Sequence, residues 1–490
     1  MKGRHSKRRL TAFIILLIAV LAGAVAFLAY LFQYSGVSQA ASAQDRHSGD
    51  AHYDMDITPY YNEGALFITQ TVDFTNGDTE LDRIMFSLPV NAYRRSSTAP
   101  MDSDEFDAAF TDNYTPGGVE FKSITVNDSK VEWGVSGTRE AVLTLLCDVA
   151  AGESVSVYME YYTVMPEFTG AGGFDNSEWR LMDFYPRLGV LDDGEWTAYS
   201  PGYVGRYDCA PVGDYSITLH ARTEYDVIAS GSASITYNQD GWNTWQIDAY
   251  DVRNLAIVMR QGGYAYERDV NGVKIRVYCD NRLKARQVVD SASALFERMN
   301  AIYEYPYPVL SIVMGDYVTY DEAAGSLILL NQSEDDMDVQ LAYLVARQWF
   351  GEIVGNDSVA EPWLSAAPAQ YSALLCTRDA GLQSQNTIRR DIDAALGITL
   401  PGGLTVESET TTFSASTDYN NVLRYRGAAV MEMLDEAMDG DFMDALTTYV
   451  RASAFEIANR SDFIDALNST DGSDWSAWLS ETLQGIGKLG

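Results

Sequence analysis

The pattern of hydrophobic residues changes once along the chain, and this change limits the folds that the sequence can adopt. Between residues 52 and 263, apolar and polar residues alternate, or short apolar runs are separated by Gly, Asn and Asp, as is typical of β-strands. After residue 335 the apolar residues are spaced as in helices, apart from a polar Thr- and Ser-rich loop at 402–421. An all-β or an all-helical protein is therefore excluded.

The length of 490 residues predicts several domains, because single hydrophobic cores stop growing well below this size. We expect an N-terminal β domain at 51–160 and a second β block at 161–265, both built as sandwich or saddle sheets. Residues 266–490 should form an α+β domain that ends in helices. This third region begins with a strand around "VKIRVYCD", a helix near 282–303 and a buried strand in "YPYPVLSIVMGDY".

The N-terminus has the features of a membrane anchor. Residues 1–9 contain five basic side chains and are the expected cytoplasmic tail, and the apolar run at 11–32 contains no charged residue. Twenty-odd helical residues span a bilayer core of about 30 Å, so we predict a transmembrane helix within 10–33 and a tether at 34–50. The alternative is a signal peptide cleaved after Ala43, although the apolar run is longer than such peptides have.

Charge and cysteine content narrow the possible partners. The net charge is −35, which disfavours binding to nucleic acid and is expected for a soluble extracellular surface. The four cysteines are too few for a disulfide scaffold, so we interpret them as core thiols, with one disulfide left open. Peptides or a membrane protein remain as partner classes.

One segment carries a recognisable motif. Residues 340–371 read "QLAYLVARQWFGEIVGNDSVAEPWLSAAPAQY", with QWFG at 348–351, Trp-Leu at 363–364 and Tyr371. This segment resembles the membrane alanyl aminopeptidase family of zinc metallopeptidases, in which an HExxH helix precedes such a QWFG and a Glu follows 19 residues after the second His. The resemblance implies a thermolysin-like domain at 266–490, a zinc cofactor bound by two His and a Glu, and a glutamate general base.

The residues that would bind zinc are replaced in this chain. The HExxH positions hold Tyr343, Leu344 and Arg347 where the family has its two ligands and its base, and Ala366 stands at the third ligand position. No histidine follows residue 220, since the four are His5, His47, His52 and His220. We therefore predict no metal ligands, no bound zinc and no confidently assigned catalytic residue.

Two further positions follow from the resemblance. "LRYRGAAVMEML" is similar to the helix with the family's transition-state tyrosine, which corresponds to Tyr425, and residues 320–327 are similar to its peptide-binding GxMEN motif, with Glu322 near the glutamate. Tyr343 and Arg347 should share one helix face. Ala366 and Tyr425 should face the same cleft.

Arg347 has two interpretations. Its guanidinium would either bind a carboxylate of a ligand or form a structural salt bridge with Glu322, Glu352 or Glu361.

Three functions remain open at this point. The first is a catalytically inactive, membrane-anchored aminopeptidase homologue that acts as a binding or scaffold module outside the cytoplasm. The second is a zinc aminopeptidase with an unorthodox site, and the third is a structural ectodomain of a membrane complex whose cleft is filled. Zinc content separates the first two, and an open cleft would count against the third.

Overall fold

The computed structural model describes residues 51–490, except 111–112, 193, 318–321, 334–336 and 486–490. The described residues lie in one compact unit, Gly49–Gly490. The anchor predicted at 10–33 lies outside the described residues. Within them, no helix combines the length and the apolar character needed to cross a membrane.

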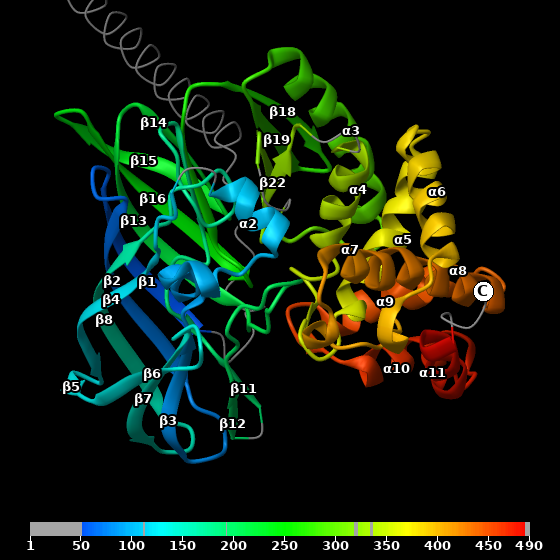
Figure 1. Ribbon diagram of the computed structural model, residues 1–490, viewed down its shortest axis with the longest axis horizontal. Helices are drawn as coiled ribbons and strands as arrows, with labels where there is room; N and C mark the ends of the chain where they lie inside the picture. Colours follow the sequence, from blue (N-terminus) through cyan, green and yellow to red (C-terminus); the bar gives the residue numbers. More distant parts are fainter. Residues whose placement is uncertain (1–50, 111–112, 193, 318–321, 334–336, 486–490) are drawn as a thin grey trace, which may run out of the picture. The chain divides into compact units, whose positions relative to one another are not determined.

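An eight-stranded sheet forms the centre of the β-rich half (Figure 1). Buried and exposed side chains alternate along its strands because one face covers the core. Its strands, in spatial order, are β15 (Ser232–Gln239), β16 (Trp242–Val252), β13 (Gly213–Arg222), β1 (Ala51–Tyr60), β2 (Ala65–Thr75), β8 (Ser154–Val164), β4 (Gly118–Val126) and β5 (Ser129–Lys130).

The two β blocks expected from the sequence are not separate domains, because they share this sheet. Strand β1 pairs antiparallel with β2 and parallel with β13, from Ala51 opposite Gly213 to Ile57 opposite Leu219. A parallel pair joins strands that are distant in sequence, and the hydrophobic pattern of either strand gives no sign of its partner. The division near residue 160 is therefore corrected to one β-rich body.

Smaller sheets complete the β-rich half, and many of their buried side chains join those of the large sheet in one core. A four-stranded sheet has the order β10 (Arg187–Leu188), β3 (Leu81–Ser87), β7 (Val142–Val149) and β6 (Glu132–Ser136). A three-stranded sheet consists of β14 (Tyr225–Ala229), β17 (Ala256–Gln261) and β9 (Glu178–Met182), and a hairpin of β11 (Val190–Asp192) and β12 (Glu195–Thr197). The short helices here are η1 (Pro89–Arg94), η2 (Ser96–Thr98) and α2 (Ser103–Ala109).

The second half begins with a five-stranded mixed sheet and continues as helices. The sheet order is β18 (Tyr264–Val270), β19 (Val273–Cys279), β20 (Val309–Gly315), β22 (Leu327–Asn331) and β21 (Glu322–Ala324). The main helices are α3 (Arg282–Asn300), α4 (Met337–Arg347), α5 (Trp363–Asp379), α6 (Ser384–Gly397), α7 (Ser416–Tyr419), the π-helical η5 (Asn420–Arg426), α8 (Gly427–Ala437), α9 (Phe442–Ser453), α10 (Arg460–Asp471) and α11 (Ser476–Gly485). Two 3-10 turns, η3 (Pro401–Gly403) and η4 (Thr410–Thr412), lie in the loop before α7, and the short β23 (Gly355–Asn356) pairs with β24 (Ile457–Ala458). This order agrees with the expected change from strands to helices.

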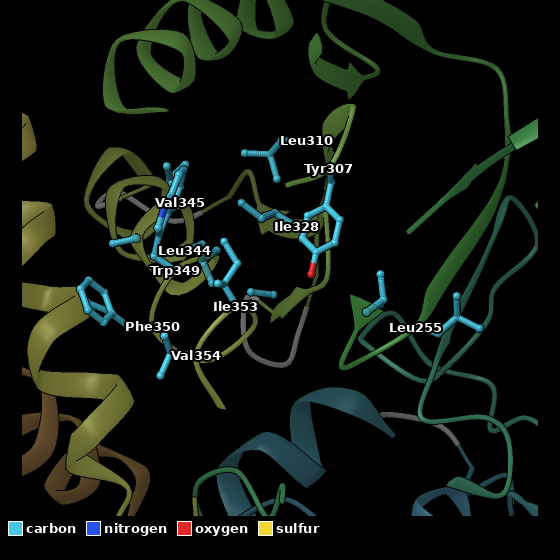
Figure 2. Close-up of a cluster of buried hydrophobic side chains, with 14 of the residues drawn as sticks. Leu255, Tyr307, Leu310, Ile328, Leu344, Val345, Trp349, Phe350, Ile353 and Val354 are labelled. Carbon is cyan, nitrogen blue, oxygen red and sulfur yellow. The ribbon is translucent and has the colours of Figure 1, made fainter. Parts of the chain in front are cut away.

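Helix α4 is held on the five-stranded sheet by its apolar face. Leu344 and Val345 are buried and lie with Ile328 of β22 and Trp349 in a cluster of hydrophobic side chains (Figure 2). Helix α5 packs against α4 along its other side. These contacts fix the two helices on which the motif residues stand. All four cysteines are unpaired.

Candidate functional site

Helices α4 and α5 bring together the four residues that the family resemblance indicates. Tyr343, Leu344 and Arg347 of α4 and Ala366 of α5 line one cavity of about 340 Å³. We call it the α4–α5 cavity. Its remaining lining comes from α4, β21, α7, η5 and a loop of the β-rich half, namely Gly205, Arg206, Glu322, Ala323, Gln340, Ser416, Tyr419, Asn420 and Arg424. Helical spacing predicts the common face of the three α4 residues, and the family resemblance predicts the position of Ala366.

The QWFG motif holds the end of α4 in place. The side-chain oxygen of Gln348 accepts hydrogen bonds from the Tyr305 hydroxyl at 2.8 Å and the Ser326 backbone N–H at 3.0 Å. Its amide nitrogen donates to the Ala324 carbonyl at 3.0 Å, and Trp349 donates to the Tyr303 carbonyl at 2.8 Å. This part of the motif therefore has a structural function that does not depend on metal.

Tyr425 does not line the α4–α5 cavity, contrary to the expectation from the family resemblance. Its neighbour Arg424 and the earlier Tyr419 do so instead, and the Tyr425 ring is half-buried against the core. The turn that carries them is π-helical, and its i→i+5 hydrogen bonds change which side chains face inward. Hydrophobic spacing does not reveal such a turn.

Arg424 is the most enclosed cation of the cavity, with 6% of its surface exposed. Its Nη2 donates to the side-chain oxygens of Gln370 at 2.9 Å and Gln340 at 3.2 Å, and its guanidinium carbon lies 3.7 Å from the centroid of the Tyr343 ring. These partners are neutral. They orient the guanidinium without compensating its charge.

Arg347, in the last turn of α4, lines the cavity and is half-buried. It forms no ion pair with any carboxylate of the described residues, so the structural salt bridge to Glu322, Glu352 or Glu361 is absent. Its guanidinium lies against Gly351, where an added Cβ would stand 2.7 Å from Cζ. The final glycine of QWFG thus makes room for this side chain.

The acidic side of the site is organised around Arg206. Its guanidinium lies 3.3 Å from Asp208, 3.5 Å from Glu352 and 3.6 Å from Glu322. Glu352 is completely buried and also accepts a hydrogen bond from the Asn254 amide at 3.1 Å. Burial raises the pKa of both Glu322 and Glu352, although Arg206 and Arg347 oppose that shift.

Two other groups titrate away from their usual range. Burial would raise the pKa of Asp208, but Arg187 and Arg206 outweigh it and lower the pKa to about 2. Burial raises the pKa of Tyr419 to about 12, so its hydroxyl stays protonated at neutral pH.

Three arginines line the cavity, and Arg206 forms ion pairs with carboxylates. Within the described chain, no carboxylate forms an ion pair with the other two, Arg347 and Arg424.

The donor set of the cavity does not fit a catalytic zinc. Its lining contains no histidine and no cysteine, and Glu322, which is engaged by Arg206, is its acidic side chain. Across the described ranges there is no group of three or more His, Cys, Asp or Glu residues arranged to hold a metal ion. Zinc sites in proteins are built from such residues, and a guanidinium at position 347 would repel a dication.

Sequence reasoning named Glu322 as a candidate but missed Arg206, Gln340, Tyr419 and Arg424. One signal was available, since Gln340 precedes Tyr343 and Leu344 by one helical turn and so shares their face. Arg206 comes from a loop of the β-rich half, and no local pattern links that loop to α4.

The comparisons with known proteins agree with this geometry. No family model matches the sequence. Aminopeptidase M1 of Arabidopsis thaliana is 26% identical over 396 residues, which cover 71% of this chain and 44% of that protein. The chain thus spans less than half the length of this relative.

Solved structures share the fold. An M1 zinc metallopeptidase from Deinococcus radiodurans has a TM-score of 0.64 and 16% identity, and the match covers 90% of this chain and 95% of that one. A mutant of the same enzyme bound to the substrate Tyr-Ser-Ala has a TM-score of 0.62, also at 16% identity, over 89% of this chain and 95% of the other. The β-rich half and the helical half therefore follow a known peptidase architecture.

Proposed function

Because this chain is a relative of the M1 aminopeptidases, we propose that it is a catalytically inactive peptidase homologue that binds peptides in the α4–α5 cavity. The observation that carries this proposal is the identity of four residues lining that cavity. Tyr343, Arg347 and Ala366 stand at the family's zinc ligand positions, and Leu344 stands at the position of its general base.

The chemical argument for inactivity is one of magnitude. Water has a pKa of about 15.7, and a catalytic zinc lowers it to about 7, which corresponds to roughly 12 kcal/mol of nucleophile activation. Arg347 has no coordination position to offer and keeps its protons, and Leu344 cannot accept one. No group lining the cavity replaces these two functions.

The open cavity favours binding over a purely structural role. A structural ectodomain would be expected to fill the former active site with side chains, yet a volume of about 340 Å³ remains next to Ala366. The structural alternative is therefore the weaker one. The second alternative, an active zinc peptidase with an unorthodox site, finds no suitable set of ligands among the described residues.

The location of the protein is part of the proposal. The apolar segment at 10–33 would anchor the chain in the cell membrane and place the peptidase-like part outside the cytoplasm, next to peptides or a membrane protein partner. Sequencing the N-terminus of the mature protein tests this. A protein that still begins at Met1 supports the anchor, and one that begins at Gln44 shows a cleaved signal.

Purified full-length protein tests the function itself. Zinc is measured by plasma mass spectrometry, hydrolysis with alanyl-p-nitroanilide, and binding of short peptides by calorimetry. Peptide binding without stoichiometric zinc and without hydrolysis supports the proposal. Chelator-sensitive hydrolysis that survives rigorous purification would instead establish an active metallopeptidase.

A further inference from the structure

The lining of the α4–α5 cavity contains more cations than anions, although the chain as a whole is strongly acidic. Three guanidinium groups line the cavity, from Arg206, Arg347 and Arg424, and Glu322 is the acidic residue of the lining. The whole chain carries a net charge of −35. Exposed charges more than about 10 Å away are largely screened at physiological salt, so the residues inside the cavity dominate the potential there.

These three cations differ in how their charge is compensated. Arg206 contacts Asp208, Glu322 and Glu352, all within 3.6 Å, and is fully compensated. Arg424 is held by the neutral Gln340 and Gln370, and Arg347 has no hydrogen-bonding or ion-pairing partner among the residues that the structure describes. A cavity with two such guanidinium groups is prepared for an anion.

Building on the proposed function, we propose that this cavity binds the carboxylate group of a peptide and that Arg347 is the residue that contacts it. The planar guanidinium fork matches a carboxylate in two parallel hydrogen bonds, and Arg347 is a half-buried residue of the cavity lining. Gln340 and Asn420 supply further amide donors on the same lining.

The same geometry argues against recognition of a peptide amino terminus. Glu322 stands near the family position that binds the substrate amine, but here it lies 3.6 Å from Arg206. An incoming ammonium would have to compete with that ion pair and would also be repelled by Arg347, which forms no ion pair with a described residue. The polarity of the site is thus opposite to that of an amine-binding site.

A neighbouring cavity provides space for the rest of the peptide. It has a volume of about 150 Å³, shares Gly205, Arg206 and Glu322 with the first cavity, and is lined on its other side by apolar residues such as Val90, Met101, Met182 and Leu255. A peptide whose carboxylate lies at Arg347 would place an apolar side chain there. Polyanions are disfavoured by the surrounding negative surface.

Calorimetry on the full-length protein with matched peptides tests this proposal. The probes are Leu-Leu-Ala with a free C-terminus, the same peptide with a C-terminal amide, the N-acetylated acid, and Leu-Leu-Glu amide, which carries only a side-chain carboxylate. We expect the free acid to bind about 10- to 100-fold more tightly than its amide, and N-acetylation to have little effect. Tighter binding of Leu-Leu-Glu amide than of the free acid would identify an acidic side chain as the preferred source of the carboxylate.

The variant Arg347→Gln identifies the contact. This variant should lose the preference for the acid over the amide. The control variant Arg451→Gln should keep that preference. Arg451, like Arg347, is a basic residue in the last turn of its helix, but it is exposed on α9. Equal binding of acid and amide by the unmutated protein, or a preference that survives in Arg347→Gln, would overturn the carboxylate assignment alone. If none of the peptides binds, both this inference and the proposed peptide-binding function are wrong.

Discussion

The guanidinium carbon of Arg424 lies 3.7 Å above the centre of the Tyr343 ring. By the family resemblance, Tyr343 corresponds to the first zinc ligand position, and here a cation covers its ring. Buried cation–aromatic contacts of this kind contribute up to about 2 kcal/mol. Arg424 and Tyr343 therefore form a specific contact between η5 and α4.

Replacing Arg424 with Met should destabilise the protein. The side-chain oxygen of Gln370, with 0% exposure, would lose its hydrogen-bond donor, and Tyr343 would lose its cation. We expect the free energy of unfolding in urea to fall by about 2–4 kcal/mol. The control Arg451→Met alters an exposed helical arginine and should change it by less than about 0.5 kcal/mol. If both substitutions change the free energy of unfolding equally, the contacts of Arg424 with Tyr343 and Gln370 contribute nothing to stability.

Restoring the family's residues should restore zinc binding. The variant Tyr343→His, Leu344→Glu, Arg347→His, Ala366→Glu provides the three ligands and the base on a scaffold that already brings these positions together, and we expect about one zinc per chain. Circular dichroism checks that it folds. The matched triple variant that keeps Leu344 should bind zinc but hydrolyse aminoacyl substrates about 10²- to 10⁴-fold more slowly than the fourfold variant. A folded fourfold variant that binds no zinc would contradict the correspondence of positions.

Gln348 should be essential for stability although no metal is involved. Gln348→Leu leaves the Tyr305 hydroxyl, the Ser326 N–H and the Ala324 carbonyl without their shared partner in a buried region. We expect a loss of about 3–5 kcal/mol in unfolding free energy. Gln383→Leu, at an exposed glutamine, is the control. A small effect at Gln348 would mean that the retained motif is not structural.

Asp208 should contribute stability that is lost in acid. Its folded pKa of about 2 lies below the usual 3.8, so its ion pairs stabilise the protein above pH 3.8 and this contribution disappears as the pH falls toward 2. Asp208→Asn should therefore cost about 2 kcal/mol at pH 7 and progressively less below pH 4. Urea unfolding at several pH values measures the difference. If Asp208→Asn lowers the free energy of unfolding equally at every pH, the ion pairs of Asp208 are not the source of this stability.

Glu352 should behave in the opposite way. Burial raises the pKa of its carboxyl group in the folded state, so ionisation costs stability as the pH rises from the ordinary value of 4.5 through the raised one. Glu352→Gln, which imitates the protonated acid, should be more stable than the unmutated protein at pH 7 but not at pH 4. A variant that is less stable at pH 7 would show that the pair with Arg206 dominates.

The sequence predicted the part of the fold and site that local patterns determine. Period-2 and helical spacing located the strands and helices, and four-residue spacing placed Tyr343 and Arg347 on one face of α4. The family resemblance placed Ala366 beside them, and the structure adds Glu322 to the same cavity. The roles proposed for these residues remain predictions.

The parts that the sequence did not predict depend on distant contacts. The parallel pairing of β1 with β13 merges two β blocks, and it is decided by burial of the whole sheet rather than by either strand. The π-helical turn exchanges Tyr425 for Arg424 at the cavity, and Arg206 reaches the cavity from a loop of the β-rich half. No spacing within α4 or η5 encodes these arrangements.

The internal position of β1 determines how the protein responds to mechanical load. A pull on the chain at Ala51 acts on a strand that is hydrogen-bonded along both edges, to β13 and to β2. An edge strand is held by one row of backbone hydrogen bonds, whereas β1 is held by two. Tension applied at Ala51 therefore acts on the interior of the sheet and not on its edge strands β15 and β5.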